Sequence, residues 1–151
     1  MAKFFETNSE IATLASDEFE KTGLAQMGID LKLISVTKAK TTLKVSKANP
    51  TTHFLTKKDV IISVYEDAFE RLSDDYKQKL MEGCISNVAY DTEKDKLIVD
   101  NSQYGELFRM RQKYEEYADI LEAAQIVMLD IEEEERQRKE AEKMAKKRKK
   151  G

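Results

Sequence analysis

Two of the side chains that catalysis commonly uses, those of histidine and cysteine, occur only once each in this chain. The one histidine, His53, lies in a threonine-rich turn, and any site that needs two imidazoles is therefore excluded. The one cysteine, Cys84, falls on the apolar stripe of an expected helix, where a buried and inert thiol is the usual outcome. Acidic side chains cluster at positions 74–75, 115–116 and 132–135, which we expect at helix starts or on solvated faces. From the residues alone, we predict no catalytic site, no metal site and no cofactor.

The composition describes one small domain. The chain has 151 residues, of which 36% are charged and 40% hydrophobic, with a formal net charge of −3. A single cysteine excludes an internal disulfide framework and fits a reducing compartment. No apolar run approaches the roughly 20 residues of a membrane span, so we expect no membrane association through such a segment. The composition thus favours a soluble, intracellular type of domain.

The periodicity of the apolar residues predicts an α+β fold. Two alternating runs, a third apolar run without strict alternation and a short fourth run predict four strands, and apolar residues at helical spacing predict two helices. We expect a small mixed or antiparallel sheet packed on these two helices, with its third strand central and covered on both faces. The strands are predicted at residues 29–36, 41–48, 59–65 and 96–100, and the helices at 8–22 and 74–89. The predicted core includes Phe19, Leu33, Val45, Ile61, Val64, Leu80, Ile85 and Leu97.

The C-terminal third is predicted to be one long helix from Gln103 to the end. Its apolar residues alternate in steps of three and four, which is the heptad spacing of a coiled coil. This seam could pack on the chain's own sheet or pair with another helix, including that of a second copy. The seam consists of Leu107, Met110, Tyr114, Tyr117, Leu121, Ala124, Met128 and Ile131.

The length of this helix suggests where a partner would bind. A straight helix from Gln103 would extend well beyond a compact body of about 100 residues. We therefore expect Ala124, Met128 and Ile131 to run out past the domain and to need a protein partner or a second copy to cover them. On this view, residues 1–131 form the domain and residues 132–151 a charged helical tail.

The tail ends in five consecutive basic residues, Lys146, Lys147, Arg148, Lys149 and Lys150. Residues 132–151 hold nine basic and six acidic side chains. The segment from Lys143 to Lys150 could contact nucleic-acid phosphates, with a steep dependence on salt. It could equally be a solvated helix end, since acidic residues followed by basic ones suit pairing along a helix and the helix dipole.

The order of elements resembles a known family. A hydrophobic strand lies in residues 54–64, an acidic helix start follows a leucine and a serine in residues 69–82, and a Tyr-Asp turn with a short strand covers residues 90–97. This order is similar to that of the phage metallopeptidases, small zincin-like proteins encoded by bacteriophages. The resemblance covers roughly residues 5–130 and implies a minimal zincin-like scaffold.

The resemblance also locates a zinc motif that has lost its chemistry. The family carries a His-Glu-x-x-His helix before the Tyr-Asp turn, and its two histidine positions fall here on Gly83 and Asn87. The general-base glutamate position falls on Cys84. Zincin catalysis needs imidazoles to hold zinc and a carboxylate to take a proton from the metal-bound water. The resemblance therefore implies a pseudoenzyme.

These expectations combine into a hypothesis about function. We expect a non-catalytic bacteriophage protein that uses a pseudo-metallopeptidase scaffold as an interaction or assembly module, in the virion or in the host cytoplasm, where it would act on a phage or host protein. The alternative is a nucleic-acid-associated protein that binds through its basic tail. An active metal-dependent hydrolase is the third hypothesis.

Overall fold

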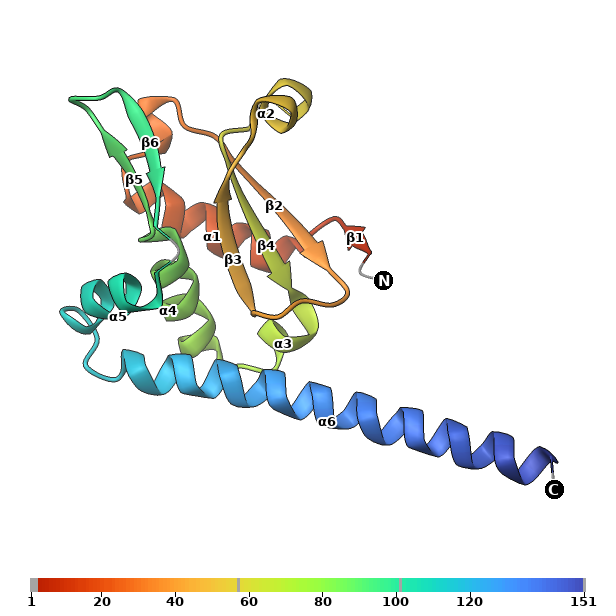
Figure 1. The fold of residues 1–151 in the computed structure, drawn as a ribbon. Coiled ribbons are helices and arrows are strands. Elements are labelled where there is room, and N and C mark those ends of the chain that lie inside the picture. The colour runs from red at the N-terminus through yellow and green to blue at the C-terminus, as the bar shows by residue number, and fades with distance from the viewer. Residues whose placement is uncertain (1–2, 57, 101, 151) are drawn as a thin grey trace.

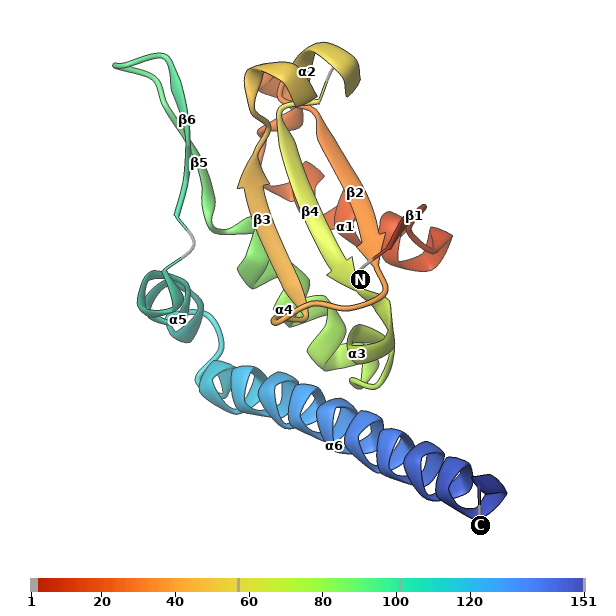
Figure 2. The same cartoon turned by 45° about the vertical axis from the view of Figure 1, so that its right-hand side comes forward.

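The computed structural model describes residues 3–56, 58–100 and 102–150, and it confirms the α+β class. A four-stranded sheet has helices α1 (Ser9–Lys21) and α4 (Asp74–Ile85) on one face (Figure 1). The long helix α6 (Tyr117–Lys150) crosses one end of this body and continues past it (Figure 2). No helix in the described part of the chain combines the length and the apolar character needed to cross a bilayer.

The sheet is mixed, as expected. Its strand order is β1 (Phe4–Phe5), β2 (Leu31–Val36), β4 (Val60–Tyr65) and β3 (Leu43–Lys47). β2 and β4 are parallel, with Leu33 opposite Ile62, whereas β1 and β3 are antiparallel to their neighbours. The connection between the parallel strands contains β3 and the short helix α2 (Pro50–Thr56). The sequence predicted β3 but not α2.

The central strand is covered on one face only, so the expectation of a doubly covered strand was wrong. Val60, Ile62 and Val64 are fully buried against the helices, while Ile61 and Ser63 on the other face are half-buried. Ile61 therefore does not belong to the core. Among the other predicted core residues, Leu33 and Leu97 are half-buried at its margin, and the buried ones are Phe19, Val45, Val64, Leu80 and Ile85.

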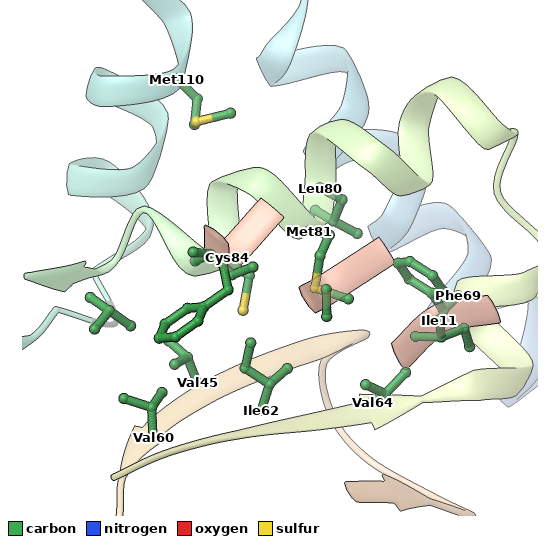
Figure 3. Close-up of a cluster of buried hydrophobic side chains, with 14 of the residues drawn as sticks. Ile11, Val45, Val60, Ile62, Val64, Phe69, Leu80, Met81, Cys84 and Met110 are labelled. Carbon is green, nitrogen blue, oxygen red and sulfur yellow. The ribbon is translucent and has the colours of Figure 1, made fainter. Parts of the chain in front are cut away.

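The core fills the space between the sheet and the helices (Figure 3). Met81 and Cys84 point from α4 towards Val45 and Ile62, and Ile11 of α1 lies beside Phe69. Phe69 comes from α3 (Glu66–Glu70), a short helix that follows β4 directly. A sheet with one apolar face and two amphipathic helices is a stable way to bury both apolar surfaces.

The predicted helix over residues 74–89 is shorter than expected. α4 ends at Ile85, and Val88–Asp91 forms strand β5, which pairs antiparallel with β6 (Lys96–Val99). This hairpin forms a separate two-stranded sheet beside the main one, so residues 96–100 are not a fourth strand of the main sheet. The apolar Val88 fits both the helical spacing of α4 and the alternation of a strand. The pattern alone therefore did not locate the end of the helix.

The long C-terminal helix is interrupted, which corrects the prediction of one helix from Gln103. α5 (Gln103–Arg111) ends in a turn, and α6 begins at Tyr117 after the irregular residues 112–116. The bend lets both halves pack on the body, because Met110 of α5 and Tyr117 of α6 each enter the core.

The bend also corrects the placement of Ala124, Met128 and Ile131. Ala124 and Ile131 are only 8% and 7% exposed, and Met128 packs at the edge of the same surface. Ile131 lies in a small cluster with Val36, Tyr65 and Ala68, at the end of the sheet. These residues therefore do not run out past the domain, and the heptad seam packs on the chain's own body.

Candidate functional site

The three positions of the degenerate zinc motif lie at the C-terminal end of α4 and near it. Ser73 caps the start of this helix by accepting a hydrogen bond from the Tyr76 amide at 3.3 Å. The three residues have different environments. Gly83 faces α6 and Cys84 faces the sheet, whereas Asn87, just after the helix, faces α5. They are thus close along the chain but do not converge on one cavity.

At Gly83, α6 approaches α4 closely. A Cβ atom built on Gly83 would overlap the Tyr117 hydroxyl, with the ring atoms Cζ and Cε1 at 2.6 and 2.9 Å. Tyr117 is fully buried, so its ring has no open space into which to move. Gly83 is therefore a packing residue, and a histidine at this position would have to displace the first turn of α6.

Cys84 faces the hydrophobic core between α4 and the sheet. Its side chain is buried, and it lies near Val45 and Ile62 (Figure 3). Burial raises the pKa of the Cys84 thiol strongly, and the negative charge of Glu106 raises it further. The thiol is consequently protonated at neutral pH, which is the form that a structural, buried cysteine takes.

Asn87 takes part in a polar network that joins α4, α5 and α6. Its amide nitrogen donates to Glu106 Oε1 at 2.9 Å, and its carbonyl oxygen accepts a hydrogen bond from Arg109. The Tyr117 hydroxyl donates to the other Glu106 oxygen at 2.8 Å, and Arg109 also pairs with Asp100 at 3.6 Å. Burial, the Glu106 charge and this hydrogen bond together raise the pKa of Tyr117. The network uses both oxygens of Glu106 in a structural role.

A second network, centred on Glu82, holds the turn between α5 and α6. Glu82 accepts hydrogen bonds from Tyr114 at 2.9 Å and Gln78 at 3.0 Å and pairs with Lys113 at 3.0 Å. Burial acts to raise the pKa of Glu82, but these three partners outweigh it and the pKa is lowered. Glu82 is therefore a charged anchor for the turn and lacks the raised pKa of a general acid.

The remaining reactive residues do not add a site. His53 lies on α2, where the sequence predicted a turn, and its Nε2 is 3.2 Å from Asp59 on the surface. Across the residues described, no group of three or more histidine, cysteine, aspartate or glutamate side chains is arranged to hold a metal ion. Glu82, Asn87 and Glu106, by contrast, hold α4, α5 and α6 together.

The candidate functional surface is consequently α6 itself. Its first part, residues 117–135 (the docked segment), carries the buried Tyr117, Ile120 and Ile131 and ends with two ion pairs. Arg71 donates to both oxygens of Glu134, at 3.0 and 2.8 Å, and Lys38 lies 3.7 Å from Glu135. Beyond this point every side chain from Arg136 to Lys149 is exposed; we call residues 136–150 the C-terminal arm. The expected tail thus begins as a docked helix and projects only after Glu135.

The arm is strongly basic. It holds nine basic and two acidic residues, including the predicted phosphate contacts Lys146, Lys147, Arg148 and Lys149, which are exposed. The side chain of Lys150, the fifth predicted contact, lies outside the described part of the structure. Arg136, Lys139, Lys143, Lys146 and Lys147 recur at intervals of three and four and form one stripe (the basic stripe) along the helix.

Sequence reasoning placed Tyr117 in the apolar seam but did not find the polar residues that surround it. Glu106, Arg109 and Tyr117 come from segments that only the fold brings together around Asn87. One signal was present: a glycine in the interior of a helix is unfavourable and often marks a close approach. Gly83 was such a signal, and it marks the contact with Tyr117.

In comparisons with known proteins, no protein-family model, no curated protein and no solved structure matches this chain.

Proposed function

We propose that this chain is a non-catalytic interaction module in which α6 is the binding element. On the resemblance described above, it would be a bacteriophage pseudo-metallopeptidase that acts in virion assembly or on a host protein in the host cytoplasm. Its partner would be another protein, and no cofactor or metal is required.

The division of α6 into two parts carries this proposal. The docked segment belongs to the core, whereas the arm presents about 22 Å of exposed helix at 1.5 Å per residue. An isolated helix of this length is marginally stable in water, and binding to another surface is the usual source of its stability. An arm of this kind contributes little to the fold, and a role in binding accounts for it.

The environment of α4 supports the non-catalytic part of the proposal. Gly83 admits Tyr117, the Cys84 thiol is buried and protonated, and Asn87 is fully engaged by Glu106 and Arg109. All three positions thus have structural roles that a zinc site would disrupt. Lost catalysis with a retained, well-packed scaffold fits a protein whose surface is the useful part.

Two measurements test the proposal. The full chain is incubated with excess zinc, dialysed and analysed by inductively coupled plasma mass spectrometry, and we expect far less than one zinc per chain. Tagged full chain and a chain that stops after Glu135 are then compared in affinity capture from phage-infected cells, after circular dichroism has shown that both fold. We expect captured proteins to be lost with the arm. One tightly bound zinc, or identical capture by both chains, would contradict the proposal.

The basic stripe favours nucleic acid as a second candidate partner. Its lysines and arginines could follow a phosphate backbone, and Lys38 lies beside the start of the arm. Binding of a fluorescent 20-base-pair duplex should then fall steeply with salt and should be lost in a Lys139→Glu/Lys143→Glu variant. Binding that is absent at 50 mM salt, or that this variant leaves unchanged, would exclude nucleic acid as the partner.

A further inference from the structure

We infer that the uncovered face of the main sheet acts together with the C-terminal arm to bind a nucleic-acid duplex through its phosphates. The inference rests on nucleic acid as the second candidate partner given above, and it adds a surface of the body to the basic stripe of the arm. The protein partner proposed for α6 does not depend on it, because that proposal makes no use of the sheet.

The basic residues outside the arm are concentrated in one part of the chain. Residues 31–58, which contain β2, β3 and α2, hold seven lysines and no aspartate or glutamate. The arm holds nine basic and two acidic residues, whereas the rest of the chain holds ten basic and 27 acidic ones. The net charge of −3 therefore conceals two basic segments in an otherwise acidic protein. Such a separation of charge attracts polyanions to the basic side.

The strands carry part of this charge on the face of the sheet opposite α1 and α4. Side chains alternate along a strand, so Ile61 and Ser63 point away from the core into which Ile62 points (Figure 3). The strand register places Lys32 beside Ile61 and Lys44 beside Ser63. None of β2, β3 and β4 contains an acidic residue. We call the residues of this side the open face: Lys32, Ile34, Lys44, Ser46, Ile61 and Ser63.

Both lysines of the open face are available to an anion. Lys44 is exposed, and no ion pair joins it to another of the described residues. Lys32 lies 3.4 Å from Glu6, whose side chain is 88% exposed and can turn away. The half-buried Ser46 and Ser63 share the face with these lysines. Lysine ammonium groups and serine hydroxyls are donors that proteins use to contact nucleic-acid phosphates.

Helix α6 lies at one end of the open face. Ile131 packs on Val36 and Tyr65, and by the alternation along β2 and β4 these two side chains point to the same side of the sheet as the open face. The helix thus crosses the end of this side and then continues beyond the body as the arm (Figure 2). A ligand that lies on the open face can therefore reach the arm without passing around the domain.

The loop between β2 and β3 joins the open face to the basic stripe. Its Lys38 faces α6 across a groove of about 480 Å³, which is lined by the first three residues of the basic stripe and by three glutamates, Glu132, Glu135 and Glu140. Lys38 lies 3.7 Å from Glu135. Because four basic and three acidic side chains line the groove, its charges nearly balance. We therefore place the phosphates on either side of the groove, on the open face and on the stripe from Lys139 outwards.

The chemistry of these surfaces fits a duplex better than a single strand. Single strands are held largely by stacking of their bases on exposed aromatic rings. The arm contains no aromatic residue, and Phe4 of β1, which is 67% exposed, is a single ring at the margin of the open face. A duplex presents closely spaced phosphates, and a major groove of about 12 Å admits an α-helix. The arm, with every side chain from Arg136 to Lys149 exposed, is such a helix.

Removal of the two open-face charges tests the inference. Binding of a fluorescent 20-base-pair duplex is measured by anisotropy for the full chain and for Lys32→Gln/Lys44→Gln, after circular dichroism has shown that both fold. We expect the affinity at 50 mM salt to fall at least about tenfold and the slope of log K against log salt to become shallower by about 2.

Lys94→Gln/Lys96→Gln is the matched control. It removes the same charge from exposed positions of the β5–β6 hairpin, whose turn is acidic, and should change the affinity by less than about twofold. Equal losses in the two variants would show that only net charge matters and would overturn the inference. Unchanged binding by Lys32→Gln/Lys44→Gln would overturn it as well.

Two competitors test the class of the ligand. Sodium poly-L-glutamate imitates an acidic protein, and we expect it to displace the duplex only at a charge concentration at least about tenfold above that of the duplex. An unlabelled single strand of 20 nucleotides should compete at least about fivefold less well than the unlabelled duplex. Displacement by poly-L-glutamate at equal charge would identify an acidic protein as the occupant, and better competition by the single strand would exclude a duplex.

The results also separate this inference from the proposed function. If Lys139→Glu/Lys143→Glu weakens duplex binding and Lys32→Gln/Lys44→Gln does not, the open face is excluded and the arm alone remains the candidate for nucleic acid. Absence of binding at 50 mM salt would overturn both. Neither result would change the comparison of captured proteins with and without the arm, which tests the protein partner.

Discussion

The docked segment and the C-terminal arm belong to one continuous helix but have opposite relations to solvent. Tyr117 and Ile120 of the docked segment are completely buried, whereas every side chain from Arg136 to Lys149 is exposed. The apolar content of α6 decreases along its length, and nine basic residues follow Glu135. Helix formation alone therefore does not reveal which part of a helix stabilises a fold, and burial distinguishes the two parts here.

The contact between Gly83 and Tyr117 should be the most sensitive point of the docked segment. In an open helix interior, glycine to alanine stabilises by about 0.5–1 kcal/mol. Gly83→Ala should instead destabilise by about 3 kcal/mol, because the new methyl overlaps the buried Tyr117 ring. Urea unfolding monitored by circular dichroism measures the change.

Gly105→Ala is the matched control for this prediction. A Cβ atom at Gly105 approaches the Asp100 carboxylate at 2.6 Å, but that side chain is about half exposed and can rotate away. We expect a change within about 1 kcal/mol of zero. If Gly83→Ala stabilised the protein as an ordinary helical glycine would, the close approach of α6 to α4 would be refuted.

Truncation of an apolar side chain should lower the unfolding free energy clearly in the docked segment and hardly at all in the arm. Ile131→Ala removes a buried side chain beside Val36 and Tyr65 and should cost about 2–3 kcal/mol of unfolding free energy. Met144→Ala on the arm should change it by less than about 0.5 kcal/mol at low protein concentration. Similar losses at both positions, measured by urea unfolding, would show that the arm packs on the domain.

Acid should weaken the attachment of α5 and α6 to the body through Glu82 of α4 and Glu134 of the docked segment. Burial acts to raise the pKa of Glu82, but Lys113, Tyr114 and Gln78 lower it overall, and Arg71 lowers the pKa of Glu134. Because the folded pKa lies below the unfolded value of about 4.3, this stabilisation is complete above that value. It is lost as the pH falls through the folded pKa. Glu82→Gln should therefore flatten the acid limb of stability against pH, whereas Glu93→Gln in the exposed β5–β6 turn should not.

The smallest effect is expected from the charge of the arm. Lys139→Gln with Lys143→Gln removes two exposed charges and should leave the unfolding free energy unchanged within about 0.5 kcal/mol. Differential scanning calorimetry at micromolar concentration is sufficient to detect a larger change. A clear drop in the melting temperature would assign the arm to the fold.

The sequence predicted those elements whose residues carry a strong local pattern. Val60, Ile62 and Val64 alternate in burial on a β-branched strand, and Phe19 and Leu80 were correctly placed in the core. The strand over residues 96–100 was predicted, but its partner β5 and the break before Tyr117 were missed because tertiary contacts, with Asn87, Glu106 and Gly83, decide them. The heptad seam was real, but periodicity does not say which surface covers it.

The exposed apolar residues of α6 show the same limit for the candidate site. Ile126 and Leu129 gave no strong signal in the sequence, because the regular seam of Ala124 and Ile131 dominates this region. Only the burial of that seam reveals that Ile126 and Leu129 remain exposed. Exposed apolar residues could therefore not be separated from core residues before the fold was known.

Hydrogen exchange along α6 tests the division of this helix most directly. Amide exchange is followed by mass spectrometry of peptides from the full chain at low micromolar concentration. We predict slow exchange for residues 117–135, close to the rate set by global unfolding, and exchange at least a hundredfold faster for residues 136–149. Uniform protection over the whole helix in this dilute sample, or fast exchange of both parts, would contradict the account.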